Sequence, residues 1–364
     1  MSESLDLIRG CLFGGAIGDA LGYAVEFQRE PEIFEKYGPE GIREPETKDG
    51  CALFSDDTQM TLFTANALLL RSSDLAEGFR SKDYLAYFWE AYQDWFYTQT
   101  EGSFAEQPHR CWLNRIPEMN QNRDPGATCM KALMDGTPGR IERPINLSKG
   151  CGGVMRVAPI GLYFEDDESY GVALLAAQAA ALTHTHELGY LPAAMLGEMI
   201  SLLTHRPELT LRQCAEEGLR AVRTLFPQAK HLLEFEDILR KAISLSLIEV
   251  NTDLEAVHML GEGWVAEECL AIALYCALKH EDDPVKALRT AVNHNGDSDS
   301  TGSVCGQILG ARKGYQALPE NWRLQIEAKS VIDQIAEDLY YDVPADAEAR
   351  RLWHKRYPRY RENV

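Results

Sequence analysis

Apolar residues recur at helical spacing along most of this chain. Within residues 5–24, for example, Leu5, Ile8, Leu12 and Ala16 fall on one face of a helix. The same spacing returns at 56–71, 81–95, 127–134, 168–182, 190–204, 209–225, 232–247, 264–279, 284–293, 298–315 and 330–341. Strand-like alternation is nearly absent, and no linker or shift in composition marks a boundary. We therefore predict one compact all-α domain covering residues 1–364.

Two stretches interrupt the helical pattern. Residues 28–52 are polar and rich in Pro, Gly and Glu, which predicts a long surface loop, and residues 96–125 look irregular. We expect the variable segment 96–145 to carry contacts with targets or partners. The aromatic residues of 81–95 predict a wall of the core, with a base-stacking platform as the alternative.

The composition restricts the class of partner. The 364 residues carry a formal net charge of −20, with 45% hydrophobic and 25% charged residues. Such an acidic protein is unsuited to nucleic acid, whose phosphates are neutralised by Lys and Arg. The nine cysteines form no CxxC pair, which favours reduced thiols over a disulfide framework or a zinc site.

The sequence also favours the cytoplasm over a membrane or secretion. The first residues have no basic region ahead of an apolar one, so we expect no secretory signal. The most apolar segment, 172–203, is interrupted by histidine and glutamate and fails as a membrane span. We expect a cytoplasmic monomer.

The first predicted helix is unusually rich in glycine. Each glycine costs about 1 kcal/mol relative to alanine in a helix interior. Close packing against another backbone or a ligand is therefore predicted by Gly10, Gly14, Gly15, Gly18 and Gly22. Glu26 follows this helix, on what we predict to be a short extended piece at 25–27.

Two acidic stretches open predicted helices. They are Ser55-Asp56-Asp57-Thr58 and Asp297-Ser298-Asp299-Ser300. Helix capping explains either one alone, because serine and aspartate are favoured at helix N-termini. Their oxygen atoms are also the ligands that Mg²⁺ and Ca²⁺ prefer. Clustered carboxylates would repel one another without cations, so we hypothesise that the two stretches meet at a two-metal centre.

A third stretch, 148–156, is rich in glycine and precedes an apolar segment. It lacks the ending of a Walker A loop, and either a tight turn or a diphosphate-binding loop fits it. Further along, His184 and His186 are two residues apart. We expect at most one of them to point into a site, and zinc binding is the weaker interpretation because no third soft ligand lies near.

Five motifs together resemble the ADP-ribosylglycohydrolase family, which includes ADP-ribosylarginine hydrolases and the dinitrogenase reductase-activating glycohydrolase. In order they are residues 14–22 with Glu26, 55–58, 150–156, 182–184 and 296–301, and the resemblance runs from about residue 5 to residue 315.

The resemblance implies a compact orthogonal helical bundle with two Mg²⁺ (or Mn²⁺) ions in a cleft. It implies metal ligands at Ser55, Asp56, Asp57, Asp297, Asp299 and Ser300. It makes Glu26, Asp57 and Asp299 catalytic, with Glu26 binding or orienting the attacking water. It implies substrate contacts from Gly150, Gly152, Gly153, Met155 and His184, and more loosely from Asp124 near the scissile bond. Asp19 takes a supporting role.

The predicted function is hydrolysis of the bond between ADP-ribose and a protein side chain, with N-linked arginine as the preferred linkage. O-linked ADP-ribose on serine, or O-acetyl-ADP-ribose, is the option within the family. The substrate would be an ADP-ribosylated protein, and a cognate ADP-ribosyltransferase or toxin is a further partner to consider. The contrasting interpretations are an immunity or regulatory protein that occludes such a transferase, and a calcium-stabilised structural bundle.

Overall fold

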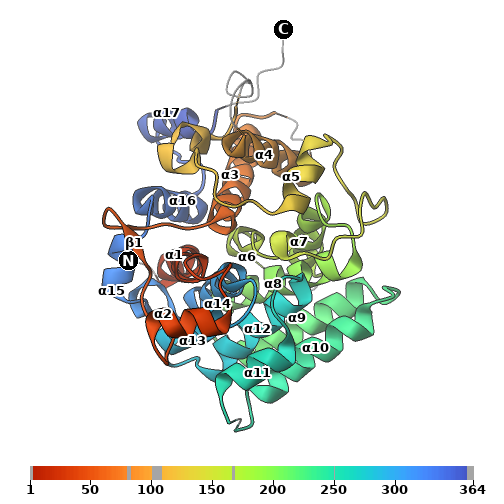
Figure 1. The fold of residues 1–364 in the computed structure, drawn as a ribbon. Helices are drawn as coiled ribbons and strands as arrows, with labels where there is room; N and C mark the ends of the chain where they lie inside the picture. Colours follow the sequence, from red (N-terminus) through yellow and green to blue (C-terminus); the bar gives the residue numbers. More distant parts are fainter. Residues whose placement is uncertain (1–2, 80–82, 101–108, 166–168, 250, 359–364) are drawn as a thin grey trace.

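Helices provide nearly all regular structure in the computed structural model, which describes residues 3–79, 83–100, 109–165, 169–249 and 251–358 (Figure 1). The α-helices are α1 (Glu3–Tyr23), α2 (Glu30–Tyr37), α3 (Asp56–Ala76), α4 (Tyr84–Gln99), α5 (Ala127–Met134), α6 (Ala158–Tyr163), α7 (Gly171–Ala181), α8 (Glu187–His205), α9 (Leu211–Leu225), α10 (Leu232–Leu245), α11 (Asp253–Leu260), α12 (Ala266–Lys279), α13 (Pro284–Val292), α14 (Ser298–Lys313), α15 (Glu320–Gln325), α16 (Lys329–Tyr341) and α17 (Ala347–Arg356). The predicted all-α class is confirmed.

Helices α1 and α14 lie side by side at the centre of the molecule (Figure 1). Their glycines allow this approach, since a Cβ added to Gly14 would overlap the carbonyl oxygen of Gly306, and one added to Gly18 would overlap that of Gly302. The close packing predicted for the first helix is therefore packing against another backbone. It brings the end of α1 beside the start of α14, where the acidic residues lie.

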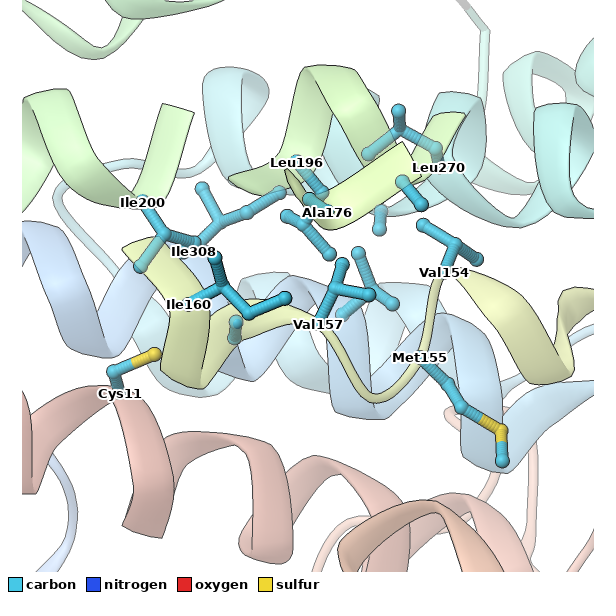
Figure 2. Close-up of a cluster of buried hydrophobic side chains, with 14 of the residues drawn as sticks. Cys11, Val154, Met155, Val157, Ile160, Ala176, Leu196, Ile200, Leu270 and Ile308 are labelled. Carbon is cyan, nitrogen blue, oxygen red and sulfur yellow. The ribbon is translucent and has the colours of Figure 1, made fainter. Parts of the chain in front are cut away.

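The end of the glycine-rich stretch 148–156 and the residues just after it divide their side chains between the core and a cavity. In Figure 2, Val154 and Val157 point toward Ala176 of α7 and Leu196 of α8. Met155 points away from this cluster and borders the cavity described below. Burial of the valines thus fixes the loop on which the cavity residues sit.

Helix α4 forms part of the core, as predicted. Tyr87, Phe88, Tyr92 and Trp95 are all buried, and the indole of Trp95 donates a hydrogen bond to Gln59 across 3.1 Å. A base-stacking platform is excluded for these four rings. Helix α4 continues to Gln99, so the irregular stretch begins later than predicted.

The predicted surface loop 28–52 is more ordered than expected. It contains α2 and a hairpin of two short strands, β1 (Thr47–Lys48) and β2 (Cys51–Ala52). Asp49 and Gly50 both have positive φ, of 53° and 83°, as a tight two-residue hairpin turn requires. Helices α6, α11, α15 and α17 were also not predicted, because each is too short or too polar to show a repeated apolar face.

Parts of some predictions lie outside the described residues. These are the first residues of the predicted helices 81–95 and 168–182, and a part of segment 96–145. Across the described ranges, the helices are all too short or too polar to span a bilayer.

Candidate metal centre and binding cavity

Both acidic helix starts border one cavity of about 550 Å³. Asp56 and Asp57 reach it from the beginning of α3, and Asp297, Asp299 and Ser300 from the beginning of α14. The other residues lining it are Glu26, Phe27, Asn122, Asp124, Pro125, Gly126, Ala127, Thr128, Cys129, Gly150, Cys151, Gly152, Met155, His184 and Trp264. Two stretches far apart in the sequence therefore meet at one site.

The start of α3 is both capped and acidic. The Ser55 hydroxyl accepts a hydrogen bond from the Asp57 backbone N–H across 3.2 Å, which makes Ser55 the N-cap. Asp19 of α1 accepts from the Ser55 N–H at 2.8 Å and from the Thr58 N–H at 3.0 Å. Because Ser55 and Asp19 accept the Asp57 and Thr58 N–H groups, the side chains of Asp56 and Asp57 are left to border the cavity.

The start of α14 supplies the closest group of carboxylates. Glu26, Asp297 and Asp299 each offer one oxygen atom within 4.8 Å of the others. Glu26 lies on a turn rather than on the predicted extended piece, because the Val25 N–H donates to the Gly22 carbonyl at 2.8 Å. This turn directly follows α1 and places Glu26 beside the start of α14.

The residues present fit a divalent cation. Glu26 Oε2 and Asp57 Oδ2 are buried, and neither has a hydrogen-bond partner among the described residues. Burial, followed by the charge of Asp299, raises the pKa of Glu26 to about 11 and that of Asp57 well above its usual value. Hard oxygen donors that cannot all ionise together are suited to a cation such as Mg²⁺ or Mn²⁺.

The glycine-rich loop forms the next part of the wall. Its centre is a short 3-10 helix, Cys151–Gly153, and Met155 is held through its carbonyl oxygen by Gln307 at 2.7 Å and Thr61 at 3.2 Å. Gly153 does not line the cavity. A Cβ there would lie 2.9 Å from the Gly189 carbonyl oxygen, so this glycine serves packing against α8.

Of the two histidines, only His184 borders the cavity. Burial, followed by the charge of Arg156, lowers the pKa of His184 to about 3, so the imidazole is neutral. His186 lies outside the cavity lining and is the N-cap of α8, where its Nδ1 accepts the Leu188 N–H at 3.1 Å. The expectation that at most one histidine would point into a site is confirmed.

Asp124 lies at the exposed mouth of the cavity. Its φ of 54° is in the left-handed region, and the Tyr23 hydroxyl donates to its Oδ2 across 2.6 Å. The neighbouring backbone is tied to α3, since the Asp56 N–H donates to the Arg123 carbonyl at 3.2 Å. The end of the irregular stretch is therefore part of the site.

Several residues of the cavity lining were not predicted as site residues, and Cys151, Phe27 and Trp264 are three of them. Cys151 Sγ donates to Asp297 Oδ2 across 2.7 Å, while Phe27 and Trp264 are 70% and 43% exposed on the cavity wall. Cys151 could have been predicted from its position within the glycine-rich loop, and Phe27 from its position next to Glu26. Trp264 had no local signal.

The chain is similar in sequence to several curated proteins. It is 25% identical to the ADP-ribosylhydrolase ARH3 of Homo sapiens over 371 residues, covering 93% of this chain and 94% of that protein. It is 25% identical to the ADP-ribosyl-[dinitrogen reductase] glycohydrolase of Rhodospirillum rubrum, covering 89% and 91%. It is 27% identical to an uncharacterised protein of Archaeoglobus fulgidus, covering 91% and 95%.

The fold has a match among solved structures. An ADP-ribosylglycohydrolase-related protein complex superposes with a TM-score of 0.59 at 24% identity, covering 93% of this chain and 99% of that chain. The sequence profile of the family described as ADP-ribosylglycohydrolase matches residues 1–348. The chain therefore belongs to the ADP-ribosylglycohydrolase family.

Proposed function

We propose that this protein hydrolyses the glycosidic bond between ADP-ribose and a modified protein side chain, with N-linked arginine as the preferred acceptor. Membership of the family supports ADP-ribose hydrolysis in general. The observation that carries the proposal is the close group of Glu26, Asp297 and Asp299 oxygens, within 4.8 Å of one another, in a cavity bordered by the glycine-rich loop.

The residues proposed to hold cations are Ser55, Asp56, Asp57, Asp297, Asp299 and Ser300. When bound, divalent cations supply positive charge that keeps these carboxylates ionised and lets a protein of net charge −20 accept a diphosphate. Both Mg²⁺ and Mn²⁺ are compatible with oxygen ligands of this kind.

The wall formed by the glycine-rich loop is proposed to bind the ADP-ribose. Gly150 and Gly152 leave room for a ligand to approach the backbone, and Met155 presents its side chain to the cavity. His184 adds a neutral polar group on the same wall. Gly153 supports this wall through its packing against α8.

Glu26 is the proposed general base. Its Oε2 has no protein partner among the described residues. Bound cations would offset the neighbouring negative charges that raise its pKa, so that Glu26 would be ionised and could take a proton from an attacking water. The water oxygen bonds to the anomeric carbon, the bond to the side-chain nitrogen breaks, and the proton taken up by Glu26 passes to the leaving nitrogen. Such proton transfer contributes about 10²–10⁴-fold to a rate.

The mouth of the cavity favours a cationic acceptor. Asp124 is exposed there, and the exposed ring of Phe27 lines the same cavity. A guanidinium group pairs with carboxylates and stacks on aromatic rings, whereas a serine acceptor needs neither. These two residues support arginine over O-linked acceptors.

The experiment is a release assay with three substrates: arginine-linked, serine-linked and O-acetyl-linked ADP-ribose, each with Mg²⁺ and with EDTA. We expect ADP-ribose release from the arginine-linked protein, abolished by EDTA. Preference for an O-linked substrate would contradict the arginine assignment. ADP-ribose binding without release from any substrate would instead support a binding protein.

A further inference from the structure

Arg156 is a buried guanidinium with no carboxylate beside it. It is fully buried, and no ion pair to it occurs among the described residues. Instead, Nη2 donates to the Ala179 carbonyl at 3.1 Å and to Thr183 Oγ1 at 2.8 Å, and the guanidinium lies 4.1 Å from the Tyr92 ring centroid. Burying an unpaired charge is costly, so this placement calls for a purpose beyond packing.

The bond to Thr183 restricts the hydroxyl. Arginine can only donate, so Thr183 Oγ1 accepts from Arg156 and has one proton left to give. The strongest acceptor beside it is His184 Nδ1, at 2.9 Å. The Cys129 sulfur also lies near Thr183 and is a weaker acceptor.

The direction of the Thr183 hydroxyl determines which nitrogen of the His184 ring carries the proton. If Nδ1 carried the proton, it would donate to Thr183, and the threonine proton would be left with only the weak sulfur acceptor. Because Thr183 is fully buried, that loss would be expensive. Nδ1 therefore accepts, and the proton of the neutral ring belongs on Nε2.

The Nε2 edge faces the cavity. His184 is only 2% exposed, yet it lines the cavity, and Nε2 has no hydrogen-bond partner among the described residues. A Cβ added to Gly152 would lie 3.0 Å from Cε1 and 3.4 Å from Nε2, and one added to Gly150 would lie 3.5 Å from Nε2. Both glycines keep this edge open to a ligand.

We propose that Arg156, acting through Thr183, is a positioning residue that holds His184 as the Nε2–H tautomer, ready to donate a hydrogen bond to an acceptor oxygen of the bound ligand. The neutral ring offers one directed hydrogen-bond donor, which a phosphate or ribose oxygen can accept. Only the identity of the ligand rests on the proposed function, because the tautomer is a property of the free protein.

Arg156 is needed because the Thr183 hydroxyl has another possible hydrogen-bond acceptor. Ala179 lies four residues before Thr183, and threonine hydroxyls commonly donate to the carbonyl at that distance. In the unmodified protein the Ala179 carbonyl accepts from Arg156 instead. Without Arg156 that carbonyl loses its donor, and we expect Thr183 to donate to it and to accept from Nδ1–H, which reverses the tautomer. Arg156→Met should therefore raise the Nδ1–H fraction, and Arg156→Lys, which can still donate to both oxygens, should restore the original form.

The test is long-range ¹H–¹⁵N NMR of the full chain labelled with ¹⁵N-histidine, with His184 assigned by its loss in His184→Gln. We expect a pyridine-like shift for Nδ1 and a pyrrole-like shift for Nε2 at neutral pH. A protonated Nδ1 in the unmodified protein overturns the proposal, and this measurement does not depend on the stability of any variant. Thr204→Val, which removes a buried hydroxyl bonded to Ile200, is the matched control and should leave the His184 signals unchanged.

The ligand half is tested by adding ADP-ribose with Mg²⁺. The Nε2 signal should shift on binding, and Arg156→Met should weaken binding about 10-fold, the value of one lost hydrogen bond. Binding with no change at Nε2 overturns the donor role. Failure of the unmodified protein to bind ADP-ribose contradicts the proposed function, and the tautomer of the free protein still decides the role of Arg156.

Discussion

Thr58, in the first turn of α3, donates its hydroxyl hydrogen to Oδ2 of Asp19 in α1 across 2.5 Å. Asp19 also accepts the backbone N–H groups of Ser55 and Thr58, so a buried carboxylate from one helix caps the start of another. The acidic residues that border the cavity are thus held in place by a carboxylate outside its lining.

Replacing that carboxylate should weaken both the fold and the site. In Asp19→Asn one amide hydrogen would face the N–H donors of α3, so we expect a loss of about 1–3 kcal/mol in the free energy of unfolding. Mn²⁺ affinity, measured by calorimetry, should fall with it. Asp283→Asn, at the N-cap of α13, should change both little, because asparagine is a good cap. Equal effects of the two substitutions would contradict the role of Asp19.

The contact between α1 and α14 makes a second prediction. Gly14→Ala would force its Cβ against the Gly306 carbonyl, and we expect a destabilisation of about 3 kcal/mol in urea unfolding. Mn²⁺ affinity should also fall, since Asp297 and Asp299 sit at the start of α14. In Gly126→Ala, the stability control, the added Cβ meets nothing within 4 Å and the φ of −56° suits alanine. Unchanged stability in Gly14→Ala would refute the contact.

The burial of His184 predicts a pH dependence of stability. Its pKa falls from 6.5 to about 3 on folding, so below pH 6.5 the unfolded chain binds a proton that the folded protein does not. The stability contribution is complete above pH 6.5 and is lost as the pH falls toward 3, by about 1.4 kcal/mol per pH unit. Urea unfolding between pH 7 and pH 5 should show a shallower decline in His184→Gln. Parallel curves for the two proteins would show that His184 is not buried as a neutral ring.

Acceptor preference can be tested at the mouth of the cavity. Asp124→Asn keeps a side-chain oxygen that can accept the hydrogen bond from the Tyr23 hydroxyl, but it removes the negative charge. The kcat/KM for the arginine-linked substrate should therefore fall about 10-fold. The serine-linked rate should not change. Asp135→Asn, which removes a surface carboxylate paired with Lys131, is the control. A loss shared by both linkages would assign Asp124 to structure rather than to acceptor recognition.

Long periodic helices were predictable from the sequence, and short elements only in part. The repeated apolar spacing located α1, α3, α8, α9 and α14 to within a few residues. Among the helices of six to ten residues, α5 and α13 were predicted. Helices α6, α11 and α17 were not, because each buries too few side chains to show a clear period. The hairpin at 47–52 did carry a usable signal, the Asp49-Gly50 pair.

The candidate site, too, could be predicted from the sequence only in part. Acidic helix starts are visible in the sequence, but spacing along the chain does not tell which helices meet. The convergence depends on the glycines shared by α1 and α14, and on Asp19, whose role depends on contacts with α3. The Arg156–Thr183–His184 chain was likewise invisible, since it joins a loop residue to the end of another helix.

The most direct test of the central claim is the turnover of Glu26→Gln with Mg²⁺ and arginine-linked substrate. We expect ADP-ribose binding, measured by calorimetry, to be retained, and ADP-ribose release to fall by about 10²–10⁴-fold. Glu35→Gln, on the exposed face of α2, should release ADP-ribose at the unmodified rate. Turnover by Glu26→Gln at the unmodified rate would contradict the account.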